Sequence, residues 1–213
     1  MNNSFQWALF YEALADKILQ FKDKRGELFE LMKRAGSEQP LMEYLHFERE
    51  DRWEPRHHQI DPFTVMGVIN RGTTEANRTA WAQVLSDAFS VGLAAPVEFT
   101  GIPVLDNRRS YFSGVDEMWD LFVLAMSEAS AGTFSTEFKT AFDKAIAVSG
   151  NGFAYVTMGL FWIKPNDFLP ARRQFPRLRR QTLRPLGAKR NLFRRRARQL
   201  HQGLQGKSCG KIA

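Results

Sequence analysis

The stretch IDPFTVMGVINRGTTEANRTAWAQVLSDAF, residues 60–89, predicts two helices joined by a tight turn. Asp61 followed by Pro62 is typical of a helix start, because Asp caps free backbone N–H groups and Pro fits the first helical turn. Gly72 suits the left-handed residue that ends such a helix. From Thr74 onward the apolar residues recur with helical period, so a second helix follows in a helix-turn-helix-like hairpin.

Two Asn-Arg pairs lie seven residues apart within this stretch. Asn70 and Arg71 are expected at the turn, whereas Asn77 and Arg78 fall on the first turns of the second helix, so all four face one point. Asn and Arg side chains bind base edges and phosphates, which makes these four residues candidates for DNA contact. The alternative is structural, because the same side chains also cap helix ends and bridge turns.

A small β-hairpin is expected after this pair of helices. Residues 102–105 form a short apolar run, the next two residues have turn chemistry, and residues 110–112 are the expected returning strand. Arg108 and Arg109 lie at or just beyond the turn. They are candidate phosphate contacts, and ordinary surface residues are the alternative.

The flanking segments are mainly helical in pattern. Apolar residues at helical spacing indicate one long helix or two short ones, divided at Gly26, in residues 4–35. Further helices are expected at residues 40–45, 115–129 and 134–148, while residues 153–163 are so uniformly apolar that buried strand and buried helix stay open. The expected fold class is therefore α+β: a helix-rich single domain with a small β-hairpin and a disordered basic C-terminal tail.

Charge is distributed very unevenly along the 213 residues. Residues 1–170 hold 16 basic and 23 acidic side chains, whereas residues 171–213 hold 14 basic and none that are acidic. The overall charge of +7 and the pI near 9.8 therefore come entirely from the last fifth of the chain. An acidic body argues against strong non-specific affinity for nucleic acid.

Several broad classes of protein are disfavoured by the sequence. The amino terminus lacks the charge and apolar run of a secretory signal, and no apolar segment is long enough to span a bilayer, so a cytoplasmic protein is expected. Cys209 is the single cysteine, which excludes an internal disulfide. His57 and His58 are adjacent and point to different faces of any regular element, so they make a poor metal pair. Neither a metal nor a cofactor is expected.

No pattern predicts catalysis. Gly206-Lys207-Ser208 lacks the earlier glycine and the strand of a phosphate-binding loop. Glu137 and Lys139 have the spacing of some nuclease motifs, but they lie on a predicted helix where solvated charges are the simpler interpretation. Asp116-Glu117 lacks the apolar strand that precedes a Walker B site. The chain is therefore expected not to be an enzyme.

Five segments together resemble a known family. FYEALADKIL, IDPFTVMGVINRGTTEANR, FTGIPVLDNRRSYF, DEMWDLF and TMGLFWIKPNDFLP, which fall within about residues 5–170, are similar to the amino-terminal region of McrB-like AAA ATPases, the 5-methylcytosine-specific restriction enzyme B family. In that family this region precedes a nucleoside-triphosphatase motor that partners a nuclease subunit. The resemblance implies a role in choosing the DNA target and a chain truncated before its motor, and it supplies no site residues.

Residues 171–213 depart from the continuation seen in that family. Permissible codons for residues 171–179, read one base later, can spell LDGNSRAY, which restores the family pattern. The same shifted frame across residues 198–212 can spell a credible amphipathic helix. We therefore hypothesise that this segment is a frameshifted and disordered tail, which sequencing of the locus tests. The alternative is a basic arm that grips phosphates.

The predicted function is a non-catalytic targeting module, residues 1–170, of a modified-DNA, type IV-like restriction ATPase. A first alternative is a protein-interaction module that docks onto the motor or nuclease subunit, which suits the acidic body better. A second alternative is a basic-tailed nucleic-acid-binding protein. The expected partners are thus DNA or a restriction nuclease or ATPase subunit, with no membrane.

Overall fold

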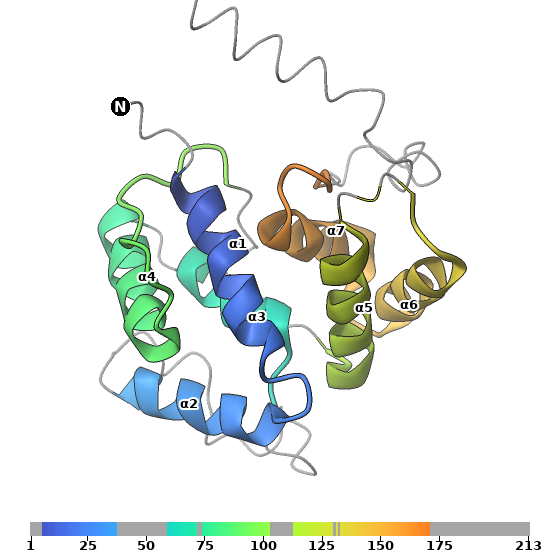
Figure 1. Ribbon diagram of the computed structural model, residues 1–213, viewed down its shortest axis with the longest axis horizontal. Coiled ribbons are helices and arrows are strands. Elements are labelled where there is room, and N and C mark those ends of the chain that lie inside the picture. The colour runs from blue at the N-terminus through green and yellow to red at the C-terminus, as the bar shows by residue number, and fades with distance from the viewer. Residues whose placement is uncertain are drawn as a thin grey trace, which may run out of the picture.

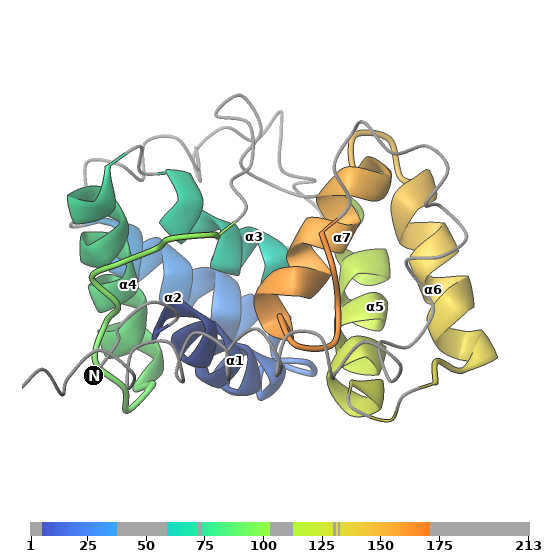
Figure 2. The same cartoon turned by 90° about the horizontal axis from the view of Figure 1, so that it is seen from above.

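A computed structural model describes the chain in six parts: residues 6–37, 59–71, 74–102, 113–129, 131 and 133–170. Figure 1 shows how their helices are arranged, with α4 (Glu75–Phe89) and α2 (Arg25–Ser37) at one side and α5 (Val115–Glu128) and α6 (Thr136–Ala147) at the other. In the view from above, α7 (Gly152–Ile163) lies between α1 (Gln6–Leu19) and the pair formed by α5 and α6 (Figure 2).

The N-terminal helical pattern is divided into two helices, α1 (Gln6–Leu19) and α2 (Arg25–Ser37). The division was predicted at Gly26, and that position is wrong because Gly26 is the second residue of α2. Hydrogen-bonded turns instead separate the helices, since the N–H groups of Phe21 and Lys24 donate to Ile18 and Phe21. Phe21 lies edge to face with Phe89 and so joins this turn to the fourth helix.

The paired helices of residues 60–89 have the predicted starts. α3 (Pro62–Gly67) begins after Asp61, whose side chain accepts a hydrogen bond from the Thr64 N–H at 2.9 Å. The chain continues directly as the 3₁₀ helix η2 (Val68–Arg71). α4 (Glu75–Phe89) begins after Thr74, whose hydroxyl accepts from the Asn77 N–H at 3.2 Å.

Three further helices complete the described fold: α5 (Val115–Glu128), α6 (Thr136–Ala147) and α7 (Gly152–Ile163). The first two confirm the helices predicted there, within two residues at each end. α7 resolves the open choice for residues 153–163 in favour of helix. It is apolar on nearly all sides because α1, α3, α5 and α6 all contact it.

The buried side chains form one cluster in which α7 and α3 approach closely. A methyl group added to Gly159 of α7 would lie 2.6 Å from the Phe63 ring of α3, so only glycine permits this packing. Asn151, at the start of α7, is buried and ties the segments together. It accepts from the Ser113 N–H at 2.8 Å and donates to the Ala145 carbonyl at 3.2 Å.

The α+β assignment is wrong. Helices account for 69% of the described residues, and no strand occurs among them. The first strand of the expected hairpin would begin at Ile102, which is outside any regular element; residues 103–112 lie outside the described part of the chain. The expected helix at residues 40–45, His57, His58 and the basic tail also lie outside it.

Candidate functional site

Asn70 is a buried structural residue in η2. Its Nδ2 donates to the Tyr11 hydroxyl at 3.3 Å, and that hydroxyl donates to the Met66 carbonyl at the same distance. Burial raises the pKa of Tyr11, so the phenol stays neutral. Only 2% of Asn70 is exposed, and its Oδ1 has no partner among the described residues. Reaching a base edge would require this residue to leave the core.

The other candidate DNA contacts are not gathered as fully as predicted. Arg71 ends η2, and its side chain lies outside the described atoms. Asn77 and Arg78 lie on the first turn of α4 and are half-exposed. The positive charge of Arg78 partly opposes the rise in the Tyr11 pKa that burial causes, as does the hydrogen bond from Asn70. Arg108 and Arg109 lie outside the described residues.

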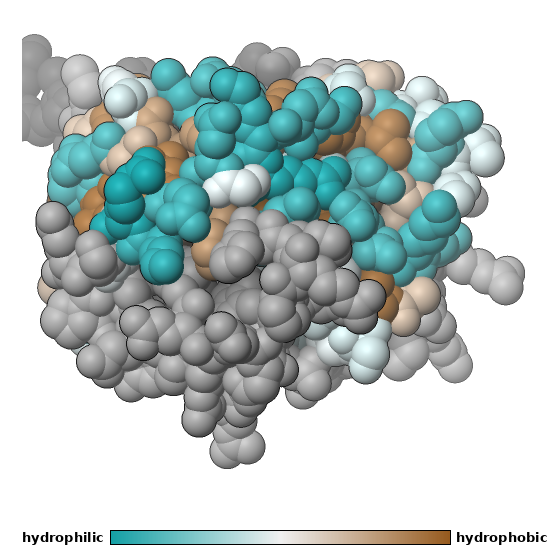
Figure 3. All heavy atoms as spheres, turned by 90° about the horizontal axis from the view of Figure 1, so that it is seen from below, coloured by the Kyte–Doolittle hydropathy of each residue, from teal (hydrophilic) through white to brown (hydrophobic). Residues whose placement is uncertain are grey.

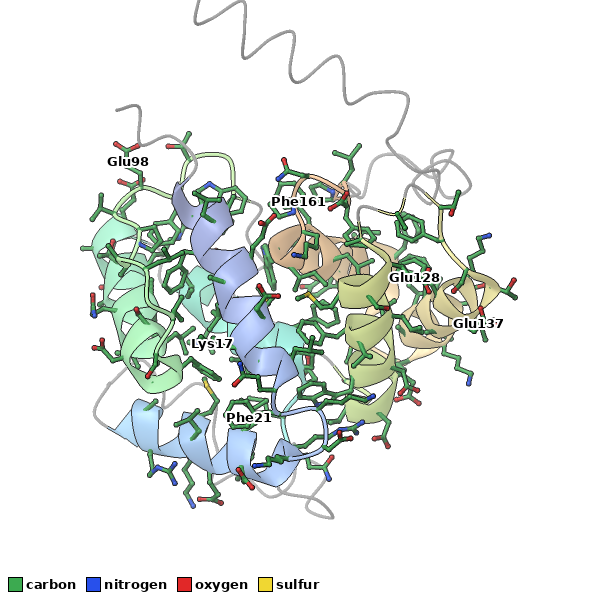
Figure 4. The ribbon with its side chains drawn as sticks, in the orientation of Figure 1. Lys17, Phe21, Glu98, Glu128, Glu137 and Phe161 are labelled. Atoms are coloured by element: carbon green, nitrogen blue, oxygen red, sulfur yellow. The ribbon has the colours of Figure 1, made fainter. Side chains whose placement is uncertain are left out.

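A groove of about 410 Å³ runs between α5 and α6 and reaches the turn between α1 and α2. We call it the α5–α6 groove. Its lining combines apolar side chains, hydroxyls and both signs of charge: Lys22, Arg25, Trp119, Asp120, Val123, Leu124, Thr136, Glu137, Thr140, Ala141 and Lys144. Glu128 near the end of α5 and Glu137 near the start of α6 are labelled in Figure 4. The two helices are antiparallel, because Glu128 accepts hydrogen bonds from Ser135 just before α6.

Arg25 forms one end of the α5–α6 groove. Its guanidinium pairs with Asp116 in the first turn of α5, and its Cζ lies 5.5 Å from the centroid of the Trp119 ring. The Trp119 indole N–H donates to the Ile60 carbonyl at 3.0 Å, so the ring under the arginine is held in place. At this end of the groove the arginine cation therefore lies over an aromatic ring that a hydrogen bond holds in place.

A second depression of about 600 Å³ adjoins the groove at the start of α2 and shares Lys22 and Arg25 with it. Together the two are lined by four basic and five acidic side chains. In the view of Figure 3, the coloured residues, which are those that the structure describes, are mainly hydrophilic. The described residues as a whole carry 16 acidic and 11 basic side chains. This surface lacks the excess of positive charge on which phosphate binding depends.

Asp61 is a buried acid with a perturbed pKa. Its side chain is 1% exposed, and burial raises its pKa to about 6. Hydrogen bonds from the Thr64 N–H and hydroxyl partly oppose this shift by favouring the carboxylate. The Asp61 carboxyl is buried and does not line the groove, so its role is to cap α3.

In the portion of the chain that the structure describes, no three His, Cys, Asp or Glu side chains lie close enough to hold a metal ion. Within that same portion, no helix combines the length and apolarity needed to cross a membrane. The α5–α6 groove was missed by sequence reasoning. The available signal was the polar row formed by Thr136, Thr140 and Lys144, one helical turn apart on the predicted helix.

The fold and the groove define an all-helical body, over the described residues, with a groove of mixed charge between two antiparallel helices. Comparison with known proteins supplies a family. The chain belongs to the family described as Domain of unknown function (DUF8425), whose family model matches residues 7–181. The match continues past residue 170 into the basic segment. No curated protein and no solved structure matches the chain. These findings leave the resemblance to McrB-like ATPases a prediction.

Proposed function

We propose that the helical body is a non-catalytic protein-interaction module that docks onto a partner subunit through the α5–α6 groove. The single observation that carries the proposal is the composition of this groove. An apolar floor with charges of both signs on its rim is suited to a protein surface, whereas a phosphate backbone requires a positive one. The acidic excess of the described body supports the same choice.

The resemblance to McrB-like ATPases provides the class of partner. In such systems a motor subunit and a nuclease subunit assemble, so the docking partner is expected to be one of these two. A restriction system acts on DNA within the cell, and a cytoplasmic location is therefore part of the proposal. The absence of a convincing phosphate-binding loop from the sequence supports a module without nucleoside-triphosphatase activity of its own.

Site-specific photo-crosslinking tests this function. A photoreactive phenylalanine at Thr140, an exposed groove residue, is compared with the same residue at Lys139, which is exposed on the outer side of α6. We expect the full-length chain to capture one protein from Thr140 and not from Lys139. That protein is then purified and titrated calorimetrically against the unlabelled chain. Formation of a stoichiometric complex supports the proposal, and crosslinks from Thr140 to DNA contradict it.

DNA targeting is the second candidate function. It is favoured by Asn77 and Arg78, which are half-exposed at the N-terminus of α4, where a helix attracts anions. A gel-shift panel of methylated and unmethylated duplexes tests it. Methylation-dependent binding that is lost in Arg78→Ala supports DNA targeting, and equal failure to bind every duplex contradicts it.

A further inference from the structure

The residues that line the α5–α6 groove follow a regular pattern. On α5 they form two rows four residues apart, Trp119 with Val123 and Asp120 with Leu124. On α6 the rows are Thr136, Thr140 and Lys144, and Glu137 with Ala141. Rows of this spacing are the ridges between which another helix packs. The groove therefore offers the spacing that a packing helix needs, and none of the described helices occupies it.

Charge is arranged along the groove with a direction. Because α5 and α6 are antiparallel, Lys144 near the end of α6 lies at the same end of the groove as Lys22 and Arg25, which reach the start of α5. Glu137 lies at the opposite end, near the start of α6 (Figure 4). Two acidic side chains offset part of the positive charge at the basic end: Asp116 is paired with Arg25, and Asp120 lines the groove. The seven residues from Glu137 to Lys144 span about 10 Å, close to two helical turns.

We infer that the groove binds one amphipathic helix of a partner protein. That helix carries an acidic residue toward Lys22 and Lys144 and a basic residue, two turns away on the same face, toward Glu137. Apolar residues between them cover Val123 and Leu124. This inference rests on the proposed function and adds the partner's chemistry and direction. The floor supplies contact area, while the opposite charges at the two ends select one orientation of the helix and reject its reverse.

A charge swap tests the direction of the helix by its effect on the affinity for the partner identified by crosslinking from Thr140. The double variant Glu137→Lys/Lys144→Glu keeps the net charge of the full-length chain but exchanges the charges at the two ends of the groove. The control is Lys139→Glu/Asp143→Lys, which exchanges the same kinds of charge on the exposed outer face of α6. We expect the groove variant to weaken binding at least tenfold and the control to change it less than twofold. Equal effects of the two swaps overturn the inference.

Two further measurements keep the result interpretable. The neutral variants Glu137→Gln and Lys144→Gln disturb α6 less than the swap, and each is expected to weaken binding about threefold to fivefold, roughly a kilocalorie or less in either case. Thermal unfolding identifies any variant that fails to fold. Mapping the crosslinked peptide then shows whether the captured segment is a helix with charges two turns apart. If the captured protein is a second copy of this chain, or if the captured segment of a partner lacks these charges, the inference fails while the docking role of the groove stands. If no protein binds, the proposed function fails first.

Discussion

The guanidinium of Arg25 lies over the indole ring of Trp119, with its Cζ 5.5 Å from the ring centroid, and thereby joins the start of α2 to α5. The side chain of Asp116, the ion-pair partner of Arg25, is 81% exposed, so solvent screens that pair, whereas the Trp119 ring is buried. The arginine both shapes one end of the α5–α6 groove and connects the N-terminal helices to the C-terminal ones.

Replacement of Arg25 tests this connection. Arg25→Ala is expected to lower the free energy of unfolding by about 1 kcal/mol, because the cation over the Trp119 ring and its apolar stem are lost. Arg25→Lys should fall between the two, since an ammonium group cannot stack as a planar guanidinium does. Urea denaturation gives the values. Lys24→Ala, at a neighbouring exposed position, serves as control, and an equal loss there would contradict the role assigned to the Trp119 contact.

Asp61 gives the protein a defined pH dependence. Burial raises its pKa from 3.8 to about 6, so between these values the folded protein holds a proton that the unfolded chain has released. The contribution of Asp61 to stability is therefore greatest at low pH and falls as pH rises through this window, by about 3 kcal/mol in total. Asp61→Asn keeps a helix cap and removes the titration.

The measurement is the difference in unfolding free energy between wild type and Asp61→Asn at several pH values. This difference isolates Asp61, because other titrating groups are common to both proteins. We expect the wild type to lose stability relative to Asp61→Asn as the pH rises from 4 to 7. A difference that stays constant over this range would show that the pKa of the buried carboxyl is not raised.

Gly159 controls the approach of α7 to α3. Gly159→Ala places a methyl group against the Phe63 ring and is expected to destabilise the fold by about 1–3 kcal/mol, despite the better helix propensity of alanine. The matched control is Gly26→Ala in α2, where nothing lies within 4 Å of the added carbon. The free energy of unfolding of that variant should rise by about 0.4–1 kcal/mol. Similar effects at the two glycines in thermal unfolding would refute the close packing.

Asn70 and Asn77 separate a structural role from a binding role. Asn70→Ala removes the hydrogen bond to the Tyr11 hydroxyl inside the core and should cost about 1–2 kcal/mol of stability. Asn77→Ala changes a half-exposed side chain and should stay within about 0.5 kcal/mol of wild type. Chemical denaturation of both variants provides the comparison. If Asn70→Ala is as stable as wild type, the structural role is wrong.

Local signals explain the helices that were predicted correctly. The starts of α3 and α4 depend on Asp61, Pro62 and Thr74, whose capping chemistry acts within three residues and is therefore visible in the sequence. α7 could not be assigned because four neighbouring helices bury it on almost every side, which removes the amphipathic period. The break between α1 and α2 was misplaced because a glycine is tolerated inside the first turn of a helix.

The candidate site was less predictable than the fold. The side chain of Asn70 has the hydrogen-bonding groups of a binding residue, yet tertiary packing brings Tyr11, 59 residues earlier in the chain, against it. The α5–α6 groove unites three segments, and its basic end depends on Arg25 meeting Asp116, 91 residues away. Such pairings across the chain leave no periodic signal in one sequence. The α+β assignment failed for a related reason, since short apolar runs specify no structure alone.

Blocking the groove tests the central claim most directly. Thr140→Trp fills the α5–α6 groove from an exposed position, while Lys139→Trp adds the same side chain to the outer side of α6. The dissociation constant of the crosslinked partner is measured calorimetrically for both variants and for wild type. The account predicts at least tenfold weaker binding for Thr140→Trp and less than a twofold change for Lys139→Trp. Unchanged affinity in Thr140→Trp would contradict the groove as the docking site.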